Sequence, residues 1–469
     1  MTLAPNSLAA RDVAYTLHPY TNLAAHEERG PLIMSRAEGI HIYDEEGNKY
    51  IEGLAGLWCT GLGYSQKRLV EAAKRQMETL PFSHFFAHRS MEPTIELAEK
   101  LISIAPKGMA KAFFVNSGSE AVDSAIKFCW YYNNARGRPK KKKIISRTRA
   151  YHGVTVASGS LTALAYAQEG WDLPLDRFLH CGTPYHYRYG KEGESEEDFA
   201  TRLADELDRQ IIAEGPETVA AFFAEPVMGA GGVLVPPATY FGKIQAILQK
   251  HDVLLVADEV ICGFGRTGNM WGSESFGMVP DMMTFAKQLS SAYIPIGGIM
   301  ISDEIYQTFV EHSNKLGIFG TGNTYGGHPV AAAVALETLK IYEDEDILGH
   351  VRSVMGLFQD RLKALGEHPL IGDARGVGLI GGLEIVKNKA TKEQFPPETK
   401  AAQKAYDAIF AHGLILRPLP GDAIGVCPPL IVTEDEINDI FDRTRRGLDD
   451  LMDELKPGGM TPPPDFLKK

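Results

Sequence analysis

Short, wholly apolar runs alternate with longer amphipathic stretches through the middle of the chain. Val219–Ala224 and Val253–Ala257 are apolar throughout, while Phe199–Glu214 and Tyr240–Lys250 place apolar residues at helical spacing. Continuous apolar runs of this length between helices are typical of strands buried on both faces of a parallel sheet. The pattern therefore predicts an α/β architecture in which right-handed crossovers join the strands.

The chain changes character at about residue 330. Long helices are predicted at Val330–Tyr342 and Ile347–Leu365, with strand-like segments at Leu379–Ile385 and Leu414–Leu416 and a last helix at Glu434–Leu455. This order of elements predicts a second, smaller α+β domain after the large one.

Charge and cysteine usage exclude several classes of partner and site. The net charge of −12 argues against nucleic acid or an anionic membrane as a partner, because phosphate binding requires a basic surface. The run Arg138–Lys143 is basic and is interpreted as a solvated turn. The five cysteines are scattered without a Cys-x-x-Cys pair, which argues against disulfides and structural zinc, and no metal site is predicted. No long apolar run or signal-like segment occurs, so a cytoplasmic location is expected.

Three short motifs, taken together, match the needs of one cofactor. Asp258 ends the apolar strand Val253–Ala257, Lys287 follows 29 residues later, and Asn116–Ala121 is a Gly/Ser turn that opens a helix. Taken alone, such residues are more often a cap, a surface charge and a helix start. Pyridoxal 5′-phosphate (PLP) needs an amine for its aldehyde, an acid for its pyridine nitrogen and a cradle for its phosphate, and the three motifs supply all of these.

A glycine motif in the same region suggests a competing cofactor. Gly263–Gly268 satisfies the spacing G-x-G-x-x-G. A dinucleotide fingerprint must open a helix, whereas Asn269–Gly277 has no apolar periodicity. A nicotinamide or flavin site is therefore not expected here.

Longer motifs resemble those of the class III aminotransferases, PLP enzymes of fold type I. Within that class the chain looks closest to the ω-transaminases, which pass amino groups from amines or ω-amino acids to pyruvate. The motifs are Val256–Gly268, Phe285–Ser291, Ile294–Gly297, Gly56–Cys59, Tyr151–Gly153, Thr324–Pro329 and Leu416–Arg417, within a match that extends from His18 to Leu430. The resemblance implies a large PLP-binding domain with a mainly parallel sheet, and a smaller α+β domain built from both chain ends. The expected division is 1–69 (contributing to the small domain), 70–329 (large domain), 330–456 (small domain) and 457–469 (a loose tail).

The resemblance also assigns roles to individual residues. Lys287 is expected to hold PLP as a Schiff base and to move the proton during catalysis, and Asp258 is expected to pair with the pyridine nitrogen. A homodimer with shared active sites is implied, because the family takes a threonine from the neighbouring subunit and Thr324 matches it. The expected cofactor-binding residues are Ser117, Gly118, Ser119, Tyr151, His152, Glu225, Asp258, Val260, Lys287 and Thr324.

The expected substrate pocket is mainly aromatic. Arg417 matches a mobile arginine that meets substrate carboxylates, for which a guanidinium is suited because it binds through two parallel hydrogen bonds. Position 323 is aromatic in many ω-transaminases and is Asn323 here, which leaves the polarity of that wall open. The expected substrate-binding residues are Tyr20, Trp58, Phe85, Phe86, Tyr166 and Arg417.

Two alternatives to an amine:pyruvate transaminase stay open at this point. The same scaffold supports PLP-dependent aminomutases and decarboxylating transaminases. A non-catalytic PLP-fold regulator is the other alternative, but it would be expected to lack the lysine or the aspartate, and both are present.

Overall fold

The structure, a computed structural model, describes residues 4–455, and its largest sheet has seven strands. These are β4 (Met109–Val115), β5 (Lys143–Arg147), β6 (Phe178–Cys181), β7 (Val219–Ala224), β8 (Leu254–Asp258), β9 (Met282–Phe285) and β10 (Gly297–Ser302). Their order in space is β4-β10-β9-β8-β7-β5-β6. Strands β9, β8, β7, β5 and β6 are parallel, whereas β10 is antiparallel to both of its neighbours. The mainly parallel sheet predicted from the sequence is thus confirmed.

The large sheet is buried on both faces, because neighbouring residues of a strand point to opposite sides. In β8, Leu255 and Ala257 belong to one core and Val256 to the other. Helix α6 (Gly118–Ala135) packs on the Val256 face, while α10 (Glu196–Glu214) and α11 (Tyr240–Lys250) pack on the opposite face. This double burial explains why β7, which is buried along its whole length, is apolar at every position.

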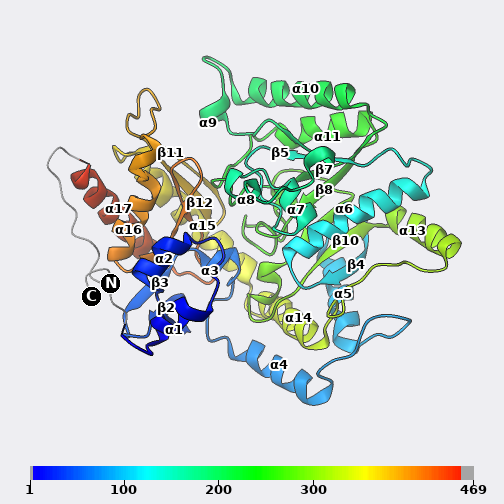
Figure 1. Cartoon of the computed structure of the whole chain (residues 1–469), viewed down its shortest axis with the longest axis horizontal. Coiled ribbons are helices and arrows are strands. Elements are labelled where there is room, and N and C mark those ends of the chain that lie inside the picture. The colour runs from blue at the N-terminus through cyan, green and yellow to red at the C-terminus, as the bar shows by residue number, and fades with distance from the viewer. Residues whose placement is uncertain (1–3, 456–469) are drawn as a thin grey trace.

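Two four-stranded sheets complete the fold. One contains β1 (Met34–Glu38), β2 (His41–Asp44), β3 (Lys49–Glu52) and β13 (Leu414–Ile415). The other contains β11 (Ile371–Val377), β12 (Ile380–Ile385), β15 (Ala423–Val426) and β14 (Arg417–Leu419). Because β3 pairs with β13, the N-terminal elements (blue) lie with the C-terminal ones (orange to red), away from the large sheet (Figure 1).

The remaining helices connect and cover these sheets. They are α1 (Leu8–Tyr15), α2 (Leu23–Arg29), α3 (Ala55–Trp58), α4 (Lys67–Thr79), α5 (Glu92–Ile104), α7 (Val156–Leu161), α8 (Ala165–Gln168), α9 (His186–Tyr189), α12 (Gly272–Ser275), α13 (Asp303–Leu316), α14 (Pro329–Asp344), α15 (Ile347–Leu365), α16 (Ala401–Ala411) and α17 (Glu434–Glu454). Short 3₁₀ turns lie at Leu175–Arg177, Lys287–Ser290 and Pro397–Thr399. Within residues 4–455, no helix is long and apolar enough to span a bilayer.

The basic run differs from its interpretation as a solvated turn. The chain does turn there, but Lys141 is buried, and its Nζ donates to the carbonyl oxygens of His251 and Asp252. Lys143 begins β5 and pairs with Glu214. The run therefore fastens the start of β5 to neighbouring elements. The expected loose tail, 457–469, lies outside the described residues, and the expected domain boundaries stay a prediction.

Candidate active site

The carboxyl-terminal ends of five strands meet at one edge of the large sheet. Strands β5, β7, β8 and β9 are parallel, and β4 runs in the same direction because β10 is antiparallel to both β4 and β9. Ligands of open α/β sheets bind outside this edge. The residues that end or follow these strands are Ser117–Ser119 (β4), Tyr151 and His152 (β5), Glu225 (β7), Asp258 (β8) and Lys287 (β9).

A cavity of about 120 Å³ opens at this edge, several times the roughly 10–15 Å³ that one water molecule requires. It is therefore large enough for a ligand. Its lining combines one amine, two carboxylates, an imidazole, a phenol and the start of a helix. The lining residues are Gly118, Ser119, Tyr151, His152, Gly153, Glu225, Asp258, Val260, Ile261 and Lys287.

Asp258 is held in a fixed orientation by neighbours from three segments. Its Oδ2 lies 2.7 Å from Nδ1 of His152, while its Oδ1 accepts from Thr284 Oγ1 at 3.1 Å and from the N–H of Val260 at 3.2 Å. Asp258 as a whole is buried, with 4% of its surface exposed. Thr284 lies directly opposite Asp258 in the β8–β9 register, which explains the contact. The buried Nε2 of His152 has no hydrogen-bond partner within residues 4–455.

Lys287 follows β9 with a left-handed backbone conformation, φ 46°. Such a conformation is unfavourable for a residue with a side chain and is concentrated at functional sites. Burial lowers the pKa of Lys287, with smaller opposing contributions from nearby acidic groups. Its Nζ lies 5.7 Å from the centre of the Trp58 ring. A lowered pKa makes the neutral amine, which is the nucleophilic form, more available at neutral pH.

Helix α6 begins at the cavity wall. Ser117 caps it, since its Oγ accepts from the N–H of Glu120 at 3.2 Å. The first backbone N–H groups of a helix have no partner within that helix and favour an anion. Gly118 packs closely on Val260, because a Cβ at Gly118 would lie 3.0 Å from a Val260 methyl carbon. Here the helix start faces the cavity and is suited to a phosphate.

Glu225 is a second buried acid at the site. Its carboxylate accepts from the N–H of Tyr151 at 3.2 Å and from the N–H of Gly229 at 3.0 Å. Burial raises the pKa of Glu225, although His152 and Arg147 oppose this. The carboxylate thereby fixes the backbone that carries Tyr151 and His152.

Comparison with known proteins identifies the family. The family model described as aminotransferase class-III matches residues 23–448. The chain belongs to the class III aminotransferases. An omega transaminase from Pseudomonas jessenii, solved in complex with PMP, is 52% identical to this chain, with a TM-score of 0.94. The match covers 97% of this chain and all of that one. A transaminase solved with L-alanine is also 52% identical, with a TM-score of 0.89, over 91% of this chain and all of that one.

A curated relative adds a second line of similarity. Gamma aminobutyrate transaminase 1, mitochondrial, from Solanum lycopersicum, is 49% identical over 94% of this chain and 86% of its own length. The chain is accordingly a PLP-dependent aminotransferase, and the expected family, enzyme class and cofactor are confirmed.

The residues at the cavity fit PLP. One cavity contains an amine at Lys287, a fixed carboxylate at Asp258, an aromatic ring at Tyr151 and a helix start at Gly118 and Ser119. A class III aminotransferase needs these four groups for the aldehyde, the pyridine nitrogen, the ring face and the phosphate, respectively. Eight of the ten cofactor-binding residues expected from the sequence line the cavity, while Ser117 caps α6 beside it and Thr324 lies elsewhere.

Four of the six expected substrate residues lie beside the cavity and not in its lining: Tyr20, Trp58, Tyr166 and Arg417. Trp58, buried at the end of α3, has the Arg417 guanidinium 5.0 Å from its ring centre. Tyr20 and Tyr166 are exposed and meet edge to face, 5.8 Å between ring centres.

The remaining expected residues, two phenylalanines and one threonine, form a second group that also does not line the cavity. Phe85, Phe86 and Thr324 are exposed, and the rings of Phe85 and Phe86 lie against Gly327 and Gly322, respectively. Within the described chain, residues 83–88 and 320–328 thus adjoin each other without lining the cavity.

Three residues at the site were not singled out from the sequence. Gly153 and Ile261 line the cavity, and Thr284 donates to Asp258. Gly153 has φ +136°, and a Cβ there would lie 2.4 Å from Ser158 Oγ and 2.7 Å from Ser119 Oγ. The triplet Tyr151–Gly153 already contained the signal, since a glycine beside two functional side chains indicates a close backbone approach.

Proposed function

We propose that this enzyme transfers an amino group from an amine or an ω-amino acid to a 2-oxo acid, with pyruvate as the acceptor. The observation that carries the proposal is the convergence of Asp258 and Lys287, from adjacent parallel strands, on one cavity. Similarity to omega transaminases, to a transaminase solved with L-alanine and to a gamma aminobutyrate transaminase supports the substrate classes.

Bound PLP supplies an electron sink for the carbanion that forms when a substrate amine loses its α-proton. In the proposal, the amine of Lys287 would hold the cofactor, and the same amine would serve as the general base and acid that moves the substrate proton. Its lowered pKa supports this role because the free amine must be neutral to accept a proton. Asp258, fixed by His152 and Thr284, keeps the pyridine nitrogen protonated.

The phosphate end of the site is proposed to involve two subunits. Gly118 and Ser119 contribute the start of α6, and Thr324 is proposed to reach the cavity of a second copy of the chain. Thr324 is exposed and outside the cavity of its own chain, as a residue with this role must be. Its neighbour Tyr325 is exposed as well, and the Tyr325 ring lies 5.7 Å from that of the exposed Phe82, so apolar surface adjoins Thr324, which supports a homodimer.

Arg417 is proposed to bind the carboxylate of the oxo acid. Within residues 4–455 its guanidinium makes no hydrogen bond or ion pair, and it lies over the ring of Trp58. An arginine in a surface salt bridge would have an acidic partner, so this arrangement supports a role in binding a carboxylate that arrives with the substrate. Stacking on an aromatic ring leaves the guanidinium edge available for that carboxylate.

Two compounds are candidates for the amino-group donor. An aromatic amine fits the exposed tyrosines and Trp58, whereas gamma-aminobutyrate is favoured by the curated relative. The cytoplasmic location expected from the sequence stays a prediction, and the named tomato relative is mitochondrial.

A donor panel tests the proposal. Purified enzyme is incubated with pyruvate or 2-oxoglutarate and with 1-phenylethylamine, gamma-aminobutyrate or β-alanine, and amino acid products are quantified. Alanine equal to the donor consumed, with no carbon dioxide released, is the expected result with pyruvate. Carbon dioxide release would indicate a decarboxylating transaminase. Rearranged donor without any need for an oxo acid would indicate an aminomutase, and either result would overturn the proposal.

A further inference from the structure

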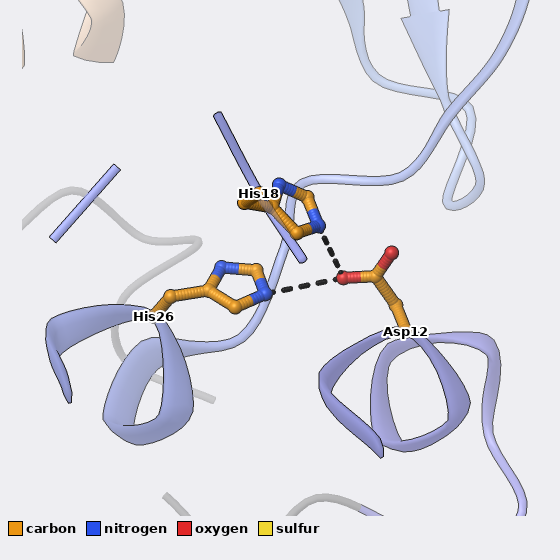
Figure 2. A group of neighbouring side chains, drawn as sticks. All are labelled: Asp12, His18 and His26. Atoms are coloured by element: carbon orange, nitrogen blue, oxygen red, sulfur yellow. Dashed lines mark hydrogen bonds and ion pairs between the residues drawn. The ribbon is translucent and has the colours of Figure 1, made fainter. Parts of the chain in front are cut away.

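The N-terminal segment brings two imidazoles and one carboxylate together outside the PLP site. Nε2 of His18 lies 2.7 Å from Oδ2 of Asp12, and Nε2 of His26 lies 3.1 Å from the same oxygen. Figure 2 shows Asp12 on α1, His26 on α2 and His18 on the connection between them, with all three side chains turned inward. Within residues 4–455 this is the single group of His, Cys, Asp and Glu side chains whose possible ligand atoms all lie within 4.8 Å of one another.

The spacing of these atoms matches a metal-binding triad. Ligands at about 2.1 Å from a metal and at right angles to one another are about 3.0 Å apart. The two distances to Asp12 Oδ2, 2.7 Å and 3.1 Å, bracket that value, and the two imidazole nitrogens lie within 4.8 Å of each other. Two histidines and one carboxylate on one face of an ion are a recognised arrangement for divalent transition metals, and they leave other positions to water.

The two helices that carry Asp12 and His26 would gain stability from such an ion. Helices α1 and α2 have eight and seven residues and contain no buried residue, so little hydrophobic burial holds them. Helices this short are marginal on their own in water. The three side chains are 10–28% exposed, which leaves an ion room to enter from solvent while partly shielding it.

Residues 12–26, which a bound ion would hold together, extend to the substrate region. Tyr20 lies two residues after His18, between two of the three side chains, and its ring meets Tyr166. After burial, the nearby phenol of Tyr20 is the next contribution to the raised pKa of Tyr151, so Tyr20 lies close to a residue of the cavity wall. Fixing the conformation of residues 12–26 therefore also fixes Tyr20 beside the wall of the PLP cavity.

We propose that Asp12, His18 and His26 bind a divalent first-row transition metal ion. The ion links α1 to α2 and restricts the position of Tyr20. The sequence did not point to this site, because its ligands are six and fourteen residues from Asp12 and follow no cysteine or helical spacing. The three ligand atoms already lie within 4.8 Å of one another, so an ion that replaces the two hydrogen bonds at Asp12 Oδ2 can be reached by all three side chains.

The experiment uses the PLP-loaded enzyme, free of any affinity tag and stripped with a chelator, titrated with Co²⁺ as the probe. Calorimetry is expected to give one tightly bound ion per chain, and visible absorption of the bound Co²⁺ reports nitrogen and oxygen coordination. Asp12→Asn, His18→Gln and His26→Gln should each weaken binding at least tenfold. Normal PLP absorption and an unchanged melting temperature without metal show that each variant is folded.

His412→Gln is the matched control. His412 lies 2.7 Å from Asp450 in a surface imidazole–carboxylate pair that lacks a third ligand, so this variant should bind Co²⁺ as the wild type does. Hydrogen exchange should slow in residues 8–29 when Co²⁺ is added to wild type, but not in Asp12→Asn. No bound ion, or equal binding by wild type and the three variants, would show a hydrogen-bonded cluster only and overturn the proposal.

Discussion

Nδ1 of His152 lies 2.7 Å from Oδ2 of Asp258, and both side chains are buried. An aspartate at a strand end often turns back to cap its own backbone. Here one oxygen is held by His152 and the other by Thr284 and the N–H of Val260. The carboxylate is therefore presented to the cavity in one orientation before any ligand arrives, which is the form of preorganisation that catalysis by charge stabilisation requires.

Asp258→Asn tests what this charge does. The amide has nearly the same shape but cannot stabilise a protonated pyridine nitrogen, so PLP should still bind while the electron sink is lost. Turnover is expected to fall by much more than tenfold, a change of over about 1.4 kcal/mol in the activation barrier. Steady-state rates and PLP absorption measure the two effects separately. A variant that keeps a tenth of wild-type turnover would refute the role.

Glu259→Gln is the matched control for that substitution. Glu259 is the next residue and is also buried, but its carboxylate accepts from the N–H groups of Gly272 and Ser273 and does not line the cavity. Its loss should lower stability while turnover per folded molecule is retained. Equal loss of turnover in both variants would mean that the site responds to the loss of any buried carboxyl group at the end of β8.

The same control variant predicts a pH dependence of stability. Burial raises the pKa of Glu259 to about 7. Between about pH 4.5 and 7 the folded protein therefore binds a proton that the unfolded chain has lost, so the free energy of unfolding falls as pH rises through this window. The stability of wild type minus that of Glu259→Gln should decrease from pH 5 to pH 8, by an amount on the order of 3 kcal/mol.

Denaturant titrations at several pH values measure this difference. Glu52, whose pKa burial also raises to about 7, is present in both proteins and cancels. A difference that stays constant across the range would show that Glu259 is ionised throughout.

The sequence predicted the elements that bury many apolar residues better than those that bury few. The expected bounds of β7, α11 and α15 agree with the structure because each buries apolar residues at a regular period. The antiparallel direction of β10 was not predicted, since strand direction leaves no trace in an apolar pattern. Helices α1 and α2 were missed because they are only eight and seven residues long and bury no residue.

The site shows the same division. Asp258 and Lys287 could be predicted because strand ends converge at one edge of a parallel sheet. The contact of Trp58 with Arg417 depends on the pairing of β3 with β13, about 360 residues apart, and could not be read from local sequence.

Gly153→Ala tests how closely the backbone must approach at the phosphate end. The added Cβ would meet Ser119 and Ser158 at under 3 Å, and φ +136° is unfavourable for alanine. Stability is expected to fall by about 1–3 kcal/mol and PLP affinity to fall with it. Chemical denaturation and PLP dissociation measure the two losses.

Gly242→Ala is the opposite case in the same domain. Gly242 is exposed within α11, and nothing lies within 4 Å of the added Cβ. This substitution should stabilise the protein by about 0.5–1 kcal/mol. Similar behaviour of the two variants would remove the argument for a required glycine at position 153.

Arg417→Ala should separate the two half-reactions. Without the guanidinium, KM for pyruvate should rise strongly, while the half-reaction with an uncharged aromatic amine should change little, since that amine brings no carboxylate. Stopped-flow absorption follows each half-reaction on its own. Arg68→Ala, which removes a surface arginine paired with Glu337 and Asp344, is the control and should leave both unchanged. Equal damage to both half-reactions by Arg417→Ala would indicate a structural role.

The most direct test of the whole account concerns Lys287. Borohydride reduction of the yellow enzyme links PLP covalently to the lysine that holds it, and peptide mass analysis then locates the adduct. The account predicts one pyridoxyl group per chain, on Lys287, and a Lys287→Ala variant that binds PLP without being labelled and turns over several orders of magnitude more slowly. An adduct on any other lysine, or near-normal turnover in Lys287→Ala, would contradict it.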